Sequence, residues 1–298
     1  TFQATIPDVL PDEEAYTKAL SLSRLAYDLE SLVSPMLAAL LLGVMSYHSL
    51  FGGTVLGFMA SAALVVSVVL PRAKIPPKRT IYERTTRGLR IYLATPRLRG
   101  LLALNLAIAA GSAMVIVNTV VLVQSGMAMT QTATATALAC FGAGSMVMAF
   151  LLPKLLDRVP ERRAMLTGAG MIAVGLIIGW AIALSYAVLL PLWFLMGLGY
   201  SLAQTPSGRL LRRSSQDMDR PALFAAQFAL SHACWLITYP LAGWVGAKFG
   251  LEASFGALGL LALSAVVLSA LLWPKEEPSE LAHTHEDLPA GHPHLATG

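Results

Sequence analysis

The sequence predicts an all-α fold, a polytopic membrane helix bundle with eight transmembrane helices. Its composition is the first reason: 56% of the 298 residues are hydrophobic and only 13% are charged, whereas soluble domains carry about 25% charged residues. The second reason is that residues 52–70 and 100–123 form two runs without any charged side chain. Runs of this length and apolarity are long enough to cross a bilayer as helices.

A strongly basic segment, residues 71–99, separates these two runs and is the third reason. It carries nine lysines or arginines and a single acidic residue, Glu83. A basic connector between two membrane-spanning runs is typical of a cytoplasmic loop, because loops rich in Lys and Arg stay on the inner side. The alternative, a solvated linker in a soluble protein, requires both uncharged runs to be core helices.

The other spans follow from the same pattern of apolar runs. We expect a long first helix at about residues 13–45, capped by Asp12, and a second span at residues 52–70. The first helix is amphipathic in its early part, so it should line something polar. Six spans are expected after the basic segment: about residues 100–123, 133–152, 165–184, 187–205, 224–245 and 253–273.

The distribution of positive charge predicts the orientation. These spans place all of the 21 Lys and Arg residues on one side except Lys248. The positive-inside rule then predicts that both ends of the chain are cytoplasmic. The net charge of +4 does not indicate a nucleic-acid partner, because the cations lie in short clusters where they meet anionic membrane lipid.

Two charged residues of the first helix are candidates for the transport pathway of a membrane protein. Arg24 and Asp28 are four residues apart, so they can pair on one helical face. Charges at membrane depth are costly unless they are paired or hydrated, and they usually mark a pathway. Alternatively, both side chains reach into water at the cytoplasmic interface.

An aromatic face is predicted in the seventh span. Phe228, His232, Trp235 and Tyr239 follow one another at steps of four, three and four, so they share one face of a helix. Ring faces with one titratable group suit a cavity that binds apolar or cationic molecules. The alternative is a packed seam between two helices.

Uncharged amides inside the spans offer further polar contacts. Asn105, Gln204 and Gln227 are candidates for the same cavity, and Asn118 is a further amide inside a span. The alternative for all four is hydrogen bonding between helices.

Residues 274–298 are polar and rich in Pro, Glu and His, so we expect a disordered tail. Its histidines form two H-x-H pairs that could chelate a divalent cation: His283 with His285, and His292 with His294. The cysteines Cys140 and Cys234 have no ligand spacing, which indicates neither a disulfide framework nor a zinc site. The chain has no H-E-x-x-H, G-x-S-x-G or P-loop motif, so we expect neither an enzyme nor a cofactor.

Residues 153–163, PKLLDRVPERR, resemble the conserved cytoplasmic loop G-x-x-x-D-R-x-G-R-R of the major facilitator superfamily, in its second copy. Four residues fit that pattern: Asp157, Arg158, Arg162 and Arg163. Pro153 and Pro160 stand where glycines are usual. Six spans after a long basic loop, with both ends inside, also resemble the C-terminal half of such a transporter.

The beginning of the chain resembles the junction of helices four and five in bacterial drug-exporter-like members. Part of it resembles the glycine-proline motif of exporters, with small residues in place of the glycines: Ser34, Pro35, Ala38 and Ala39. The resemblance implies that residues 1–70 end the N-terminal lobe with its last two helices. It implies a linker at 71–99 and a six-helix C-terminal lobe at 100–273, and it suggests that this sequence is N-terminally truncated.

The resemblance implies a secondary transporter of a bacterial inner membrane. It implies that the protein acts as a monomer and that its partners are protons and a small-molecule substrate. Alternating access between two lobes would export the substrate. Asp157 and the nearby arginines would act as a cytoplasmic gating loop. Two alternatives are a divalent-metal exporter that uses the histidine tail and a membrane sensor or partner-binding protein that transports nothing.

Overall fold

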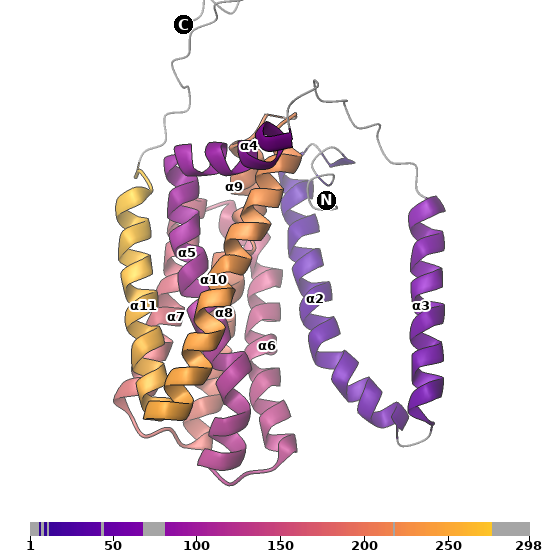
Figure 1. The fold of residues 1–298 in the computed structure, drawn as a ribbon, viewed down its shortest axis with the longest axis vertical. Coiled ribbons are helices and arrows are strands. Elements are labelled where there is room, and N and C mark those ends of the chain that lie inside the picture. Colours follow the sequence, from indigo (N-terminus) through magenta and orange to yellow (C-terminus); the bar gives the residue numbers. More distant parts are fainter. Residues whose placement is uncertain are drawn as a thin grey trace, which may run out of the picture.

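A computed structural model describes residues 6, 9–10, 12–42, 45–67, 81–216 and 218–275, leaving out the side chains of residues 31–40, 42 and 81–85. All regular secondary structure in these ranges is helical (Figure 1). The α-helices are α2 (Glu13–Leu42), α3 (Tyr47–Ser67), α4 (Ile81–Ala94), α5 (Pro96–Ala113), α6 (Gln131–Leu156), α7 (Glu161–Ala181), α8 (Tyr186–Gln204), α9 (Ser207–Arg213), α10 (Arg220–Phe249) and α11 (Leu251–Leu272). Two π-helical segments, η1 (Met114–Asn118) and η2 (Val121–Gly126), continue α5.

Each of the eight predicted spans contains a helix, so the all-helical prediction is confirmed for the described residues. Seven of the described helices are long and apolar enough to cross a membrane. The helix α2 is not among these seven, so the count of eight stays a prediction. Asp12 caps α2 as expected, since its Oδ2 accepts a hydrogen bond of 2.8 Å from the Ala15 backbone N–H.

The basic segment at residues 71–99 contains an ordered helix where the sequence predicts only a connector. Helix α4 runs across one end of the bundle and packs against the start of α10 (Figure 1). Arg87 of α4 forms an ion pair with Asp219, with 2.6 Å between Nη2 and Oδ2. This contact fixes the linker to the bundle that follows it.

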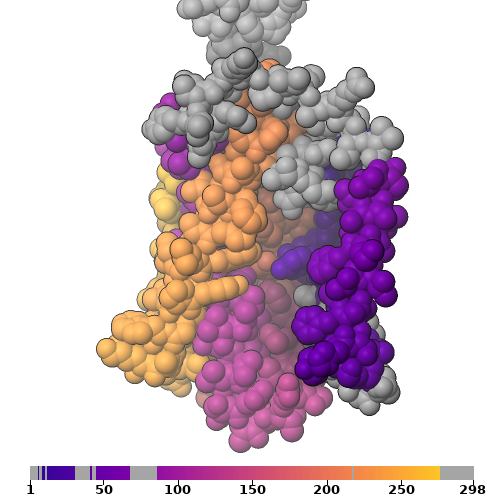
Figure 2. Space-filling view, turned by 45° about the vertical axis from the view of Figure 1, so that its right-hand side comes forward, coloured from indigo at the N-terminus to yellow at the C-terminus, as the bar shows by residue number. Residues whose placement is uncertain are grey.

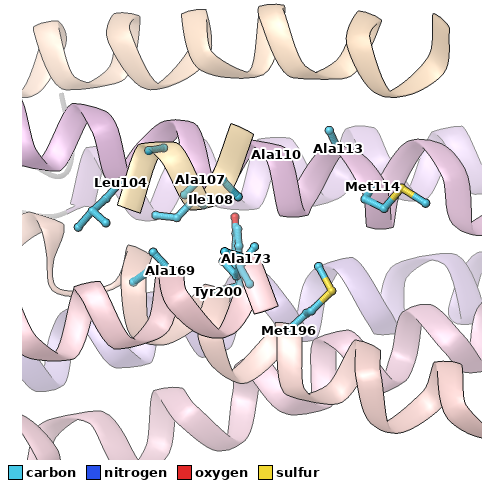
Figure 3. Packing of buried hydrophobic residues seen from close by; sticks show 14 of the residues in the cluster. Leu104, Ala107, Ile108, Ala110, Ala113, Met114, Ala169, Ala173, Met196 and Tyr200 are labelled. Atoms are coloured by element: carbon cyan, nitrogen blue, oxygen red, sulfur yellow. The ribbon is translucent and has the colours of Figure 1, made fainter. Parts of the chain in front are cut away.

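Small side chains allow the helices of the bundle to approach closely. Figure 3 shows alanines of α5 and α7 between larger side chains such as Ile108 and Met196. Helices α6 and α8 approach closely where Gly197 faces the backbone of Phe141 and Gly144 faces that of Phe194. Helices in a membrane associate through such close packing, because lipid supplies no hydrophobic driving force between them.

Helices α2 and α3 lie beside this bundle. Helix α2 packs against α6 and α9, whereas none of the residues of α3 is buried. Figure 1 shows α3 apart from the bundle, with α2 between them. The exposed side chains of α3 include Phe51, Leu56 and Phe58, and an apolar surface of this kind suits contact with lipid.

Candidate functional site: a cavity between α2, α8 and α10

A cavity of about 400 Å³ lies between α2, α8, α9 and α10. Its size falls in the range of about 300–1,000 Å³ that is common for small-molecule sites. In Figure 2 the surface is hollowed between α10 and α3, with α2 behind. The walls therefore combine a helix from the first part of the chain with helices from the last part.

The aromatic face predicted for α10 forms a continuous column of rings. The ring centroids of Phe228 and His232 are 3.8 Å apart, and those of His232 and Trp235 are 4.9 Å apart. Tyr239 continues the column, nearly parallel to Trp235 at 6.4 Å. The first three rings line the cavity, and Tyr239 is not among the described lining residues.

His232 is held by a hydrogen bond within its own helix. Its Nδ1 lies 2.7 Å from the carbonyl oxygen of Phe228. Because a carbonyl only accepts, Nδ1 must carry the proton, and Nε2 remains as the nitrogen that can bind a proton or a solute. The exposed ring favours the cavity interpretation over a packed seam, and contact with a solute stays a prediction.

Arg24 and Asp28 form the predicted pair in the wall that α2 contributes. Arg24 Nη2 lies 2.6 Å from Asp28 Oδ1, and the two side chains are only 13% and 4% exposed. Arg24 Nε also lies 3.3 Å from Ser145 Oγ on α6, and its guanidinium lies 4.4 Å from the ring centre of Tyr200. This burial disfavours the alternative in which both charges extend into water.

The predicted amides fall into two groups. Gln204 and Gln227 line the cavity, whereas Asn105 donates to Gln227 Oε1 at 3.4 Å and is not among the described lining residues. Tyr92 donates to the same oxygen at 2.5 Å. Asn118 Nδ2 donates to Ser254 Oγ at 3.0 Å. Asn105 and Asn118 therefore connect helices, and Gln227 both connects helices and reaches the cavity.

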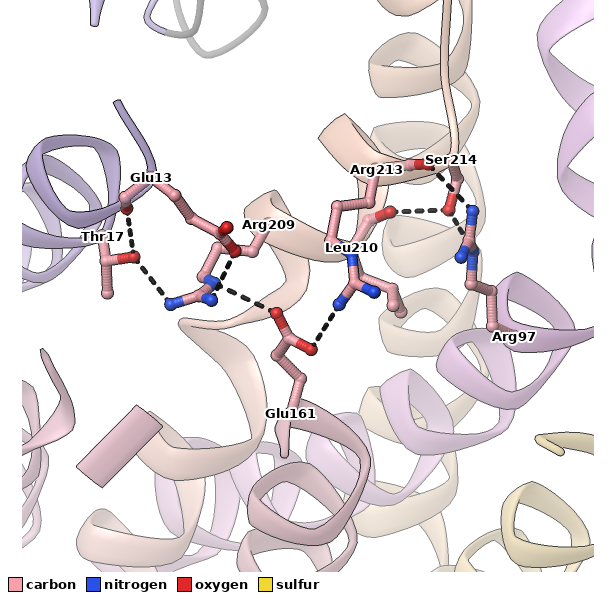
Figure 4. Close-up of polar contacts among 8 residues, drawn as sticks. All are labelled: Glu13, Thr17, Arg97, Glu161, Arg209, Leu210, Arg213 and Ser214. Atoms are coloured by element: carbon pink, nitrogen blue, oxygen red, sulfur yellow. Dashed lines mark hydrogen bonds and ion pairs between the residues drawn. The ribbon is translucent and has the colours of Figure 1, made fainter. Parts of the chain in front are cut away.

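Four charged residues and Thr17 join three helices at one end of the cavity, and we call Glu13, Thr17, Glu161, Arg209 and Arg213 the end network (Figure 4). Glu161 accepts from Arg209 Nε at 3.1 Å and from Arg213 Nη1 at 2.9 Å. Arg209 Nη1 also donates to Thr17 Oγ1 at 2.9 Å, and its Nη2 pairs with Glu13. The end network therefore ties α2 to α7 and α9.

The end network lies directly beside the cavity. Ser207, Gly208 and Leu211 of α9 line the cavity, and Arg209 follows Gly208 in the same helix. Moving α2 away from α9 at this end requires Arg209 to lose its bonds to α2.

The predicted gating loop has a different set of contacts. Asp157 is exposed at the end of α6, and the described part of the chain gives it no ion pair. Arg158 and Arg163 are exposed as well. Arg162 donates to the carbonyl oxygen of Trp273 at 3.0 Å, at the end of α11. The gating role of these four residues stays a prediction.

Sequence reasoning missed the acidic members of the end network. Glu161 stands in the quoted segment PKLLDRVPERR, immediately after Pro160, where a helix can begin. Glu13 is the first residue of α2, directly after the cap Asp12. A charged residue at a helix start beside the predicted gate was the available signal for Glu161, and no such signal marked Glu13.

Two predicted sites lie outside what the structure can test. The exporter-type residues Ser34, Pro35, Ala38 and Ala39 belong to α2, but their side chains are outside the described part. The tail histidines His283, His285, His292 and His294 lie outside the described residues altogether. Among the residues that are described, no group of three or more His, Cys, Asp or Glu could hold a metal ion.

The comparison with known families decides the class of this protein. A sequence model described as the Major Facilitator Superfamily matches residues 101–292, more than half of the chain. The chain belongs to the major facilitator superfamily. The predicted family is therefore confirmed, and with it a secondary transporter that crosses the membrane several times. No curated protein matches this sequence.

Proposed function

We propose that this transporter is a proton-coupled exporter of small molecules, which bind in the cavity between α2 and α10. The observation that carries the proposal is the buried Arg24–Asp28 pair, whose Arg24 lines the cavity opposite the column of rings on α10. Buried charges inside a membrane protein usually mark the path of a substrate or a proton.

In this proposal, the end network closes one side of the cavity and must open during each transport cycle. We place that side in the cytoplasm of a bacterial inner membrane, because it carries most of the positive charge. The bonds between Arg209 and α2 are then the contacts that alternating access breaks and remakes.

The test is transport into inside-out membrane vesicles that contain the full-length protein. A proton gradient, acidic inside, should drive accumulation of solutes from a panel of fluorescent aromatic compounds. A proton ionophore should abolish the accumulation, and so should the double variant Arg24→Gln/Asp28→Asn. Accumulation that is indifferent to both treatments would contradict proton coupling through this site.

A further inference from the structure

We infer that the cavity is built for aromatic acids, meaning a planar ring that carries a carboxylate or a similar anionic group. This inference rests on the proposed function, because it names the substrate class of the same site. It goes against the expectation from the rings alone, which also suit cations. The charges in the cavity walls decide between an anionic and a cationic solute.

The described lining residues include one charged side chain, Arg24, and no carboxylate. Asp28 lies behind Arg24 and is only 4% exposed, so a solute in the cavity meets the guanidinium first. A cationic solute would gain from the rings but would face a like charge. An anionic solute meets a donor of the opposite charge.

The guanidinium has donors left for a solute. Its Nε and Nη2 atoms are used by Asp28 and Ser145, and within the described part no hydrogen bond uses Nη1. A guanidinium carries five N–H groups in a planar fork, which suits carboxylates. Hydrogen bonds between ions are roughly twice as strong as neutral ones, so Arg24 can select an anion.

The rings select the remainder of the solute. Six of the described lining residues carry a ring: Tyr27, Tyr200, Phe224, Phe228, His232 and Trp235. Phe228 is 63% exposed, so much of its ring is open to a solute. Aromatic rings prefer offset-stacked or edge-to-face contact with other rings. A planar solute can therefore lie along the column of α10 with its anionic group toward Arg24 on α2.

Three probes with the same ring system separate the charge classes: 2-naphthoate, neutral 2-naphthamide and the 2-naphthylmethylammonium cation. Binding to the full-length protein in nanodiscs of zwitterionic lipid would be measured by titration calorimetry. The expected result is that naphthoate binds about tenfold more tightly than either other probe, because it alone gains the ionic hydrogen bonds. A preference for the cation, equal affinities or no binding of naphthoate would overturn the inference.

Variants assign the preference to Arg24. Arg24→Gln/Asp28→Asn removes both charges and leaves no unpaired charge buried, so the fold should survive. It should remove the preference for naphthoate, so that naphthoate and naphthamide bind with similar affinity. Arg24→Lys should retain only part of the preference, since it keeps the positive charge but loses the planar fork of donors, and Arg158→Gln is the matched control for an exposed arginine outside the cavity. A preference that persists in the double variant would overturn the inference.

Failure of the inference and failure of the proposed function give different results. Proton-driven transport of another solute, without the naphthoate preference, would contradict the aromatic-acid substrate class and support the proposed export function. Selective naphthoate binding without any proton-driven transport would support the aromatic-acid site and contradict the proposed proton-coupled export.

Discussion

Arg209 Nε of α9 and Glu161 Oε1 of α7 lie 3.1 Å apart, in side chains that are only 14% and 11% exposed. Arg209 also donates to Thr17 of α2, so this single arginine connects three helices. Exposed ion pairs contribute only about 0–1 kcal/mol. A shielded pair that joins separate elements is a better candidate for a contact that holds one conformation.

Glu161→Gln should loosen the end network and open this end of the cavity more often. The measurement is alkylation of a cysteine at Ser207 by a polar maleimide, in protein whose Cys140 and Cys234 are replaced by alanine. The rate should rise several-fold, because the half-buried position becomes accessible when α2 separates from α9. Glu252→Gln at the start of α11 is the control and should leave the rate unchanged. An unchanged rate in Glu161→Gln would show that the end network does not hold this end of the cavity closed.

The Arg24–Asp28 pair should show strong coupling in a double-mutant cycle. Asp28→Asn alone leaves the Arg24 charge buried without its partner, which costs about 3–5 kcal/mol. The double variant Arg24→Gln/Asp28→Asn should be far less destabilised than the sum of the two single variants. Denaturant unfolding in detergent measures all four proteins. Additive losses would mean that water or other groups already neutralise each charge.

The packing of α6 against α8 predicts a large effect of a single methyl group. A β-carbon at Gly197 would lie 1.9 Å from the carbonyl oxygen of Phe141, which is backbone and cannot rotate away. Gly197→Ala should therefore destabilise the protein by about 1–3 kcal/mol, as overpacking does. The control is Gly170→Ala in α7, where a β-carbon meets nothing within 4 Å. That change should be neutral or stabilising by up to about 1 kcal/mol, because alanine favours helices.

His232→Ala and Trp235→Ala should lower transport or change substrate preference without reducing the amount of inserted protein. The reason is that both rings line the cavity, where their loss removes solute contacts and leaves helix packing intact. Vesicle transport and quantitative immunoblotting of the same membranes measure the two effects separately. Poor insertion combined with normal transport by the surviving protein would show that the column is structural.

Cysteine labelling tests the orientation. A cysteine in place of Ser49, near the start of α3, should react with an impermeant reagent added from outside. A cysteine in place of Thr85, in α4, should react only after the cells are permeabilised, because the basic segment is expected inside. The reverse pattern would contradict the predicted topology.

Much of the fold could be predicted because a membrane restricts the choice of structure. Backbone groups in lipid must satisfy their hydrogen bonds internally, so an apolar run of sufficient length indicates a helix. The column on α10 was also predictable, since Phe228, His232 and Trp235 follow helical spacing within one element. The Arg24–Asp28 pair is equally local, with its members one helical turn apart.

Only the tertiary structure decided which distant groups meet. Arg209 and Glu13 are 196 positions apart in the sequence, and the rotation of two packed helices brings them together. The packing of α5 against α10 likewise turns Gln227 toward the cavity and leaves Asn105 between helices, although both are amides in apolar runs. The apolar pattern of a membrane helix distinguishes lipid from protein poorly, because both are apolar. The partner of each polar side chain therefore follows from how the helices pack, which the sequence of a single helix does not specify.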